Sequence, residues 1–327
     1  MKATMVVDAT KTTDDGAIKQ DIDQHALFDA ISKSDLEAVK KILKEEPEWQ
    51  NLCDDMNRTP LMTACLYDNT EVVAKIIEAL DDKCSEINKS TTPSRNPAME
   101  SPEMKKLLKS LVFAGQKVRK IEMRKHTALV IASEEGHLSI LQLLVNHGAD
   151  INQNDGSTAL RSACMRGHLE CVEYLLENFA DPSLVNKDTT STPLIVAVMI
   201  GSEDIVAVLL KHGNNGLNTA VTGCDGLAAL HVAASRRNPV IFGMLLQHGA
   251  NIHAISKRGW TALDHAVIRR SMDIPEASLM VDMLLARGAK VPTGTFLRCF
   301  FMGGGVQSLA SLWPSRVWKI PSKEVDR

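Results

Sequence analysis

Cysteine and histidine are the residues of this chain best able to do chemistry, since they bind metals and act as nucleophiles or bases. The sequence holds ten histidines and seven cysteines. Their spacing favours neither role, because no C-x-x-C pair and no H-E-x-x-H motif occurs. The sequence also has no glycine-rich phosphate loop, no G-x-S-x-G and no kinase signature. We therefore expect a protein that is not an enzyme and that has no metal site and no cofactor.

The histidines recur instead at fixed places in a repeating pattern. His137 and His168 both follow a glycine. Three others come directly before a glycine or in the matching place near the end of a unit: His147, His212 and His248. Cys65 and Cys164 occupy a slot where other copies have alanine or valine. This regularity predicts structural roles for the histidines and buried thiols for these two cysteines.

The clearest unit of the pattern covers residues 126–152, HTALVIASEEGHLSILQLLVNHGADIN. A first helix-sized run stops at Gly136. A second run stops at Gly148, where a left-handed helix end favours glycine. Two short antiparallel helices of this kind cannot bury their own apolar face, so the unit needs neighbours.

Seven copies of this unit follow one another. They start at residues 25, 59, 127, 158, 192, 228 and 261, so successive starts lie 34, 68, 31, 34, 36 and 33 residues apart. A period of about 33 residues with a T-P-L-H-x-A signature is typical of ankyrin repeats. The chain resembles the ankyrin repeat family over residues 21–291. The resemblance implies an all-α ankyrin repeat solenoid of stacked helix-turn-helix units with short β-turn fingers.

The interval of 68 residues is two periods long, which predicts a degenerate eighth repeat with a loop insertion at about 81–124. Its first helix is interrupted by Pro97 and Pro102. The alternative is a mobile insertion in a stack of seven repeats. In either case we expect the weakest interface of the stack here. Residues 1–20 are polar and predict a disordered tail, and residues 292–327 predict a C-terminal tail or cap.

Three departures from the pattern lead to separate expectations. Phe179 stands in a glycine slot, so its helix should end differently or the register should slip. Pro275 lies in a widened gap, which predicts a longer loop at 271–278. Asn152 matches an asparagine that an intracellular hydroxylase can modify in the resembled family. A hydrogen bond that pins the turn is the role we favour for it.

The resemblance also implies where a partner would bind. In the family's geometry, the residue before each start and the two residues before each inter-helix glycine slot face a concave groove. From these positions we select eleven candidate residues for partner binding: Tyr67, Glu134, Glu135, Met165, Arg166, Met199, Ile200, Leu227, Arg236, Trp260 and Arg269.

The candidate residues change character along the chain. The first are acidic, the central ones are apolar, and those of the C-terminal half are mostly basic, with Trp260 among them. Arginine and large aromatic residues are enriched in interface hot spots. We expect a protein partner with apolar anchors and an acidic stretch that lies over the C-terminal repeats. The alternative is that these arginines are ordinary solvated charges.

Composition leaves the broad class of function open. The net charge of −3 favours no particular partner. Residues 1–23 contain no apolar core of signal-peptide length, and no run approaches the roughly 18 apolar residues of a membrane span. We expect a monomeric adaptor or scaffold in the cytoplasm, with the nucleus as an alternative. Two other hypotheses are a nucleic-acid-associated regulator that uses the basic run at 105–125, and a fragment or isoform of a larger ankyrin protein.

Overall fold

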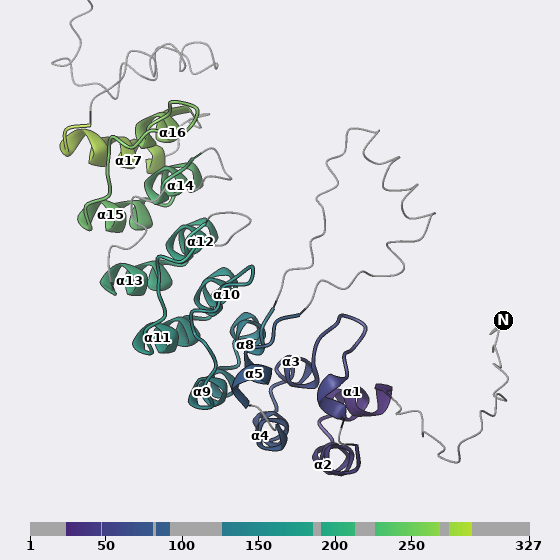
Figure 1. Ribbon diagram of the computed structural model, residues 1–327. Coiled ribbons are helices and arrows are strands. Elements are labelled where there is room, and N and C mark those ends of the chain that lie inside the picture. The colour runs from purple at the N-terminus through teal and green to yellow at the C-terminus, as the bar shows by residue number, and fades with distance from the viewer. Residues whose placement is uncertain are drawn as a thin grey trace, which may run out of the picture.

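The structure, a computed structural model, describes residues 24–46, 48–80, 83–91, 126–185, 191–212, 226–268 and 275–289. These residues form helices and turns, and none of them lies in a β-strand. The helices stand in two rows that run side by side along one extended stack (Figure 1). The predicted all-α solenoid is therefore confirmed.

The inner row contains the first helix of each unit, and each of these helices contacts the next. Its members are α1 (Gln24–Ser32), α3 (Pro60–Ala64), α8 (Ala128–Glu135), α10 (Ala159–Arg166), α12 (Pro193–Ile200), α14 (Ala229–Arg236) and α16 (Ala262–Ile268). These helices make up one side of the stack in Figure 1. We call the surface they expose the inner-helix face.

The outer row contains the second helix of each unit. Its members are α2 (Leu36–Glu45), α4 (Thr70–Ala79), α9 (Leu138–Asn146), α11 (Leu169–Glu177), α13 (Glu203–Lys211), α15 (Pro239–Gln247) and α17 (Pro275–Ala286). The 3-10 helix η1 (Trp49–Asn51) and the short α5 (Lys83–Ile87) lie in connections between units. Each outer helix contacts the next outer helix, so both rows are continuous.

Threonine caps explain why the inner helices start where the repeat pattern predicts. In four of them the threonine Oγ1 accepts a hydrogen bond from the backbone N–H three residues later, at 3.2–3.3 Å. The four caps are Thr59, Thr127, Thr158 and Thr192. Gly136 ends α8 with a φ of 80°, a conformation that suits glycine. The sequence signals for both helix ends are therefore confirmed.

Phe179 ends the outer helix α11 in the way that Gly148 ends α9. Its φ is 64°, and the next residue, Ala180, donates its N–H to the carbonyl of Leu175 at 2.9 Å. The helix therefore neither ends differently nor slips in register, which corrects both alternatives expected from the sequence. The side chain of Asn152 in the preceding unit hydrogen-bonds to the carbonyl of Phe179 and to the N–H of Asp181, and these bonds support the turn without glycine.

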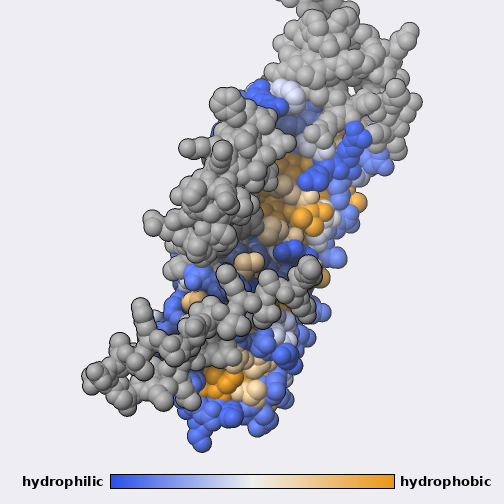
Figure 2. Space-filling view, turned by 90° about the vertical axis from the view of Figure 1, so that its right-hand side faces the viewer, coloured by the Kyte–Doolittle hydropathy of each residue, from blue (hydrophilic) through white to orange (hydrophobic). Residues whose placement is uncertain are grey.

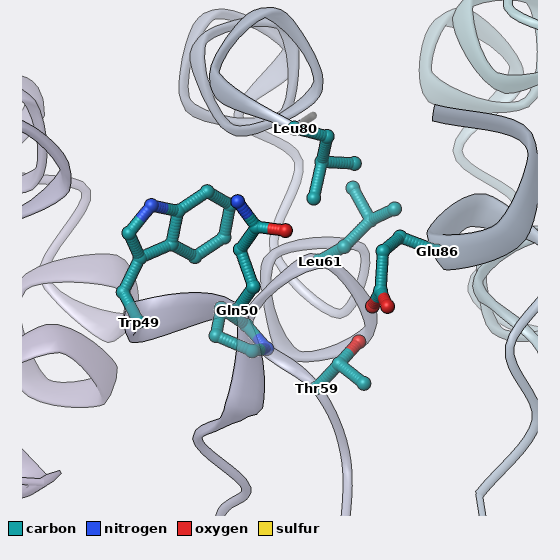
Figure 3. A pocket seen from close by; sticks show the side chains of 7 residues that line it. Trp49, Gln50, Thr59, Leu61, Leu80 and Glu86 are labelled. Carbon is teal, nitrogen blue, oxygen red and sulfur yellow. The ribbon is translucent and has the colours of Figure 1, made fainter. Parts of the chain in front are cut away.

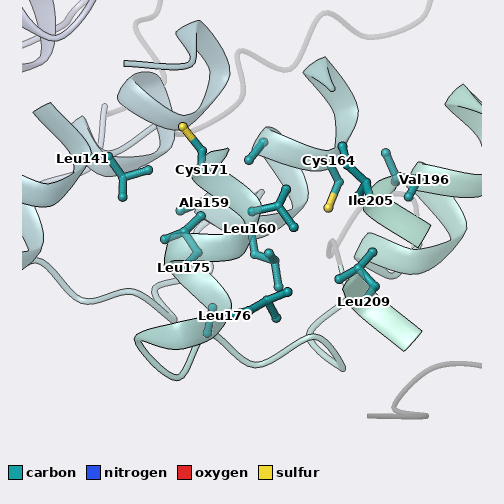
Figure 4. Close-up of a cluster of buried hydrophobic side chains, with 14 of the residues drawn as sticks. Leu141, Ala159, Leu160, Cys164, Cys171, Leu175, Leu176, Val196, Ile205 and Leu209 are labelled. Atoms are coloured by element: carbon teal, nitrogen blue, oxygen red, sulfur yellow. The ribbon is translucent and has the colours of Figure 1, made fainter. Parts of the chain in front are cut away.

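Leucine, isoleucine and valine side chains from both rows fill the interfaces between units (Figure 4). Cys164 and Cys171 lie among them, and Cys65 is buried in an earlier unit. Burial raises the pKa of the Cys65 and Cys164 thiols, and it raises that of Cys171 to about 11. These thiols stay protonated and act as small apolar side chains, as predicted for Cys65 and Cys164.

The unit of α3 and α4 packs directly on the unit of α8 and α9. His137 Nε2 lies 3.3 Å from the carbonyl oxygen of Leu66, and His168 Nε2 lies 2.9 Å from that of Glu134 one unit later. The two units are therefore in direct contact, and the degenerate repeat expected at about 81–124 stays a prediction. From residue 92 to residue 125 that segment lies outside the described residues.

Two hydrogen bonds join the ends of this segment. The N–H of Thr91 donates to the carbonyl of His126, and the N–H of His126 donates to Thr91 Oγ1, both at 2.9 Å. Residues 91 and 126, at the two ends of the segment, therefore lie side by side at one turn. Both alternatives for the segment, a degenerate repeat and an insertion in a stack of seven repeats, stay predictions.

Asparagine side chains tie consecutive turns together. Asn152 Nδ2 donates to the carbonyl of Phe179 at 3.3 Å, and its Oδ1 accepts from the N–H of Asp181 at 2.8 Å. Asn88 makes the same two bonds to the turn that follows α9, at 3.2 and 2.7 Å. The turn-pinning role expected for Asn152 is therefore present in the structure.

The last outer helix starts earlier than the sequence predicts. α17 begins at Pro275, and proline suits the first turn of a helix because its missing N–H would have no partner there. Residues 275–278, which belonged to the expected loop, are therefore helical. Residues 269–274, the tail at 1–20 and the tail at 292–327 lie outside the described residues.

Candidate functional site

One row of exposed side chains runs along the inner-helix face. Each member lies eight residues after the start of its unit, at or just beyond the end of an inner helix, so all of them occupy the same place in successive units. We call this row the ladder, and its described members are Lys33, Tyr67, Glu135, Arg166, Ile200 and Arg236. Every one of these side chains is exposed. Five of the eleven candidate residues thus lie on a single line.

An apolar patch lies in the middle of the inner-helix face, over α12 (Figure 2). Ile200 is 55% exposed and Met199 is 38% exposed, although both side chains are large and apolar. Met165 on α10 and Leu227 before α14 are partly buried against the core on either side. The structure therefore brings the predicted apolar candidates together.

Two arginines flank this patch along the ladder. Arg166 precedes Ile200 by one unit and Arg236 follows it by one unit, because α10 and α14 both contact α12. Neither guanidinium makes a hydrogen bond or an ion pair with any described residue. Glu135, one unit before Arg166, is exposed and also makes no such bond within the described part of the chain. Within the described part of the chain, nothing pairs with these three charges.

Glu134 differs from Glu135, although the sequence placed both in the groove. Its carboxylate is only 13% exposed and lies 3.5 Å from Nδ1 of His126. The Glu134 side chain therefore faces His126, in the turn that precedes α8 of the same unit. Of the predicted acidic pair, only Glu135 points freely to solvent.

The finger residues of the central units point into the stack, which the family geometry did not lead us to expect. Ser157 and Ser191 are buried. Arg161 of α10 lies between them; its Nη1 donates to Ser157 Oγ and its Nε to Ser191 Oγ, both at 3.3 Å. Arg161 is itself 4% exposed. The charged residue at the fourth place of T-A-L-R was the sequence signal for this contact, and sequence reasoning missed it.

Trp260 stabilises the turn that precedes α16, which is the finger of its unit. Its indole packs edge-on against the ring of His265, with centroids 5.3 Å apart. The backbone N–H of Trp260 donates to Ser256 Oγ at 3.1 Å, and its backbone carbonyl accepts from His231 Nε2 at 3.1 Å. The ring is partly buried and is a weaker candidate than the ladder residues. Arg269 lies outside the described residues, so the structure does not place it.

His231 holds the histidine place of the T-P-L-H signature and is fully buried. Its Nδ1 accepts a hydrogen bond from the N–H of Ala228 at 3.0 Å, so its proton lies on Nε2 and points to the carbonyls of Ala254 and Trp260. Burial lowers the pKa of His231, and the bonds to these carbonyls oppose that shift. The ring therefore joins two fingers in its neutral form, which is the structural role predicted for it.

The described residues offer no obvious place for a metal or small molecule. They contain no group of three histidine, cysteine, aspartate or glutamate side chains that could hold a metal ion. A crevice beside Trp49, lined by Gln50, Thr59 and Glu86, encloses about 190 Å³ including open solvent (Figure 3). Small-molecule sites usually measure about 300–1,000 Å³. Among the described helices, none is long and apolar enough to cross a membrane.

Comparisons with known proteins agree with this architecture. The profile of the family described as "Ankyrin repeats (3 copies)" matches residues 98–186 and 194–293. The B-cell lymphoma 3 protein homolog of Mus musculus is 30% identical over 232 residues, which are 68% of this chain and 50% of that protein. The nuclear factor NF-kappa-B p105 subunit of Gallus gallus is 24% identical over 242 residues, 70% of this chain and 24% of that protein. This chain thus spans half or less of the length of these relatives.

Solved structures show the same fold. The ankyrin repeat domain of Bcl-3 aligns with a TM-score of 0.58 and 22% identity, covering 80% of this chain and 97% of that domain. The human ASB11 ankyrin repeat domain aligns with a TM-score of 0.59 and 22% identity, covering 81% of this chain and 99% of that domain. At this level of identity the likeness concerns the fold alone.

Proposed function

Because the chain belongs to the ankyrin repeat family, we propose that it is a non-enzymatic adaptor that binds a segment of a protein partner along the inner-helix face. The observation that carries the proposal is the ladder with its central patch. Ile200 and Met199 expose apolar surface between Arg166 and Arg236, whose charges no described residue neutralises.

Physical chemistry supports this use of the face. Exposed apolar side chains gain free energy when a partner removes them from water, at about 25 cal/mol per Å² of apolar surface. Methionine adapts its shape to different partners because its side chain is unbranched and flexible. Arginine adds directional hydrogen bonds to carboxylates. A partner segment with apolar anchors and acidic residues would satisfy both properties of the face.

The proposal includes a monomeric state and a cytoplasmic or nuclear location. The described cysteines Cys53, Cys65, Cys164 and Cys171 are free thiols, which suits a reducing compartment. The competing hypothesis of nucleic-acid binding depends mainly on the basic run at 105–125. That run lies outside the described residues, so the structure adds nothing in its favour.

A comparison of captured proteins would test the proposal. Proximity labelling in cells would use the intact chain beside the variant Met199→Asp/Ile200→Asp. Val240→Asp is the matched control, since Val240 is 48% exposed on the outer helix α15. We expect a set of proteins that disappears with the inner-face variant and persists with the control. An identical set for all three chains would move the binding surface away from the inner-helix face.

A further inference from the structure

The ladder has a spacing that an extended peptide can follow. Consecutive inner helices are in contact along the row, and packed helices lie about 8–10 Å apart. Ladder residues hold equivalent places on these helices, so neighbouring members are separated by about the same distance. An extended chain advances roughly 3.3 Å per residue. One unit of the stack therefore corresponds to about three residues of a bound segment.

The chemical order of the ladder is Glu135, Arg166, Ile200 and Arg236. Resting on the function proposed above, we propose that the inner-helix face selects an extended protein segment in which an apolar residue has an acidic residue three positions before it and another three positions after it. A basic residue six positions from the apolar one, on the side that meets Glu135, completes the pattern. The apolar residue contacts Ile200 and Met199, and the two acids face Arg166 and Arg236.

The fold itself does not require these charges. A basic residue in the last turn of a helix is favourable because it interacts with the helix dipole. Yet α8 ends in Glu135 and α12 ends in Ile200 at the equivalent place, and both helices form and end in the same left-handed turn. The ladder positions are therefore free to vary in type, and their order carries information for a partner.

We expect the inner-helix face to bind a segment with this pattern more tightly than a peptide that is acidic throughout. Arg166 and Arg236 lie two units apart, with the apolar patch between them. A continuous acidic run would place carboxylates against Ile200 and would also approach Glu135, and like charges repel. Apolar contact at the centre and opposite charge at defined distances are thus required together.

Selection from a peptide library would test the pattern. The probe is a phage-displayed library of random 12-residue peptides, selected on the immobilised full chain and counter-selected on the Ile200→Asp variant. We expect the retained peptides to share an apolar residue, with aspartate or glutamate enriched several-fold at three positions before and after it. Displacing one acid by a single residue should weaken binding by up to about fivefold, as for one exposed ion pair.

Charge reversal would show which arginine each acid meets. Selection on Arg166→Glu should replace one of the two acids by lysine or arginine and leave the other, and selection on Arg236→Glu should do the reverse. All variants change exposed side chains, and circular dichroism and thermal melts would verify that they fold like the parent.

The outcomes separate the pattern from the proposed function. Peptides that need Ile200 but show no acids at the expected spacing would overturn the pattern and leave the adaptor function standing. If counter-selection on the Ile200→Asp variant removed every peptide that binds the parent chain, the pattern would be overturned too. If proximity labelling also showed no inner-face dependence, the proposed function would fail with it.

Discussion

The backbone of Phe179 has a φ of 64°, a left-handed conformation that is unfavourable for any residue with a Cβ atom. A positive φ costs a residue with a Cβ atom roughly 1–2 kcal/mol relative to glycine, and the phenyl ring is 89% exposed and so gains little by packing. We expect Phe179→Gly to raise the free energy of unfolding by about 0.5–1 kcal/mol, since the extra flexibility of unfolded glycine offsets part of the gain. Urea denaturation would measure the change.

Phe179→Ala is the control for this substitution. Alanine removes the ring but keeps the Cβ atom, so the strain at φ 64° remains. The free energy of unfolding of the Phe179→Ala variant should therefore lie within a few tenths of a kcal/mol of that of the parent. If alanine and glycine stabilised the protein equally, the ring and not the backbone would be the source of the strain.

His231 makes the stability of the C-terminal units depend on pH. Burial lowers its pKa below the ordinary value of 6.5. A group with a lowered folded pKa contributes stability above its unfolded pKa and loses that contribution as the pH falls through the folded pKa. We therefore expect stability to decline below about pH 6.5, because a proton on Nδ1 breaks the bond from the N–H of Ala228.

Comparison with His231→Gln would isolate this effect. The parent should exceed the variant in unfolding free energy at about pH 7.5, and the difference should shrink toward about pH 5. Asp264 and His265 lie close to the ring, and both are present in the variant. A difference that stayed constant over this range would show that His231 does not titrate as its burial implies.

At the scale of single helices, Arg161 links α10 to two turns, the one that precedes α10 and the one that precedes α12. Its guanidinium is buried and donates to Ser157 and Ser191. We expect Arg161→Met to lower the free energy of unfolding by about 2–3 kcal/mol, since hydrogen bonds from charged groups contribute about 1.5–3 kcal/mol and two buried hydroxyls lose a partner. Chemical denaturation would measure it.

Arg166→Met is the matched control, since Arg166 lies on the same helix and is exposed. This change should alter stability by no more than about 0.5 kcal/mol. Equal effects of the two substitutions would contradict the structural role assigned to Arg161.

The helix ends and the small buried positions could be predicted from the sequence, because they depend on residues within a single unit. Threonine caps, glycine helix ends and the small slots filled by Cys65 and Cys164 depend on residues within one unit, so the repeat pattern revealed them. The contact between Arg161 and Ser191 joins different units, and no local pattern encodes it. The pairing of Glu134 with His126 depends likewise on side-chain direction. The ladder could be placed from the period alone, whereas the burial of Ser157 and Ser191 could not.

At the scale of the whole molecule, the stack depends on contacts between neighbouring units, so its weakest interface limits cooperativity. α3 has five residues whereas α8 has eight, and the two helices meet at the junction that the sequence marked as weak. We expect backbone amides of α1 to α4 to exchange hydrogen faster than those of α8 to α13. Hydrogen exchange followed by mass spectrometry would measure this, and uniform protection across the junction would contradict it.

The hydrogen bonds between Thr91 and His126 have a consequence for how such a chain can change over generations. Because these bonds hold residues 91 and 126 at one turn, a change in the length of the sequence between them should cost little loop-closure free energy. We therefore expect evolution to tolerate insertions and deletions between residues 92 and 125, while the contacts of α3 and α4 with α8 and α9 and the order of charges along the inner-helix face stay the same.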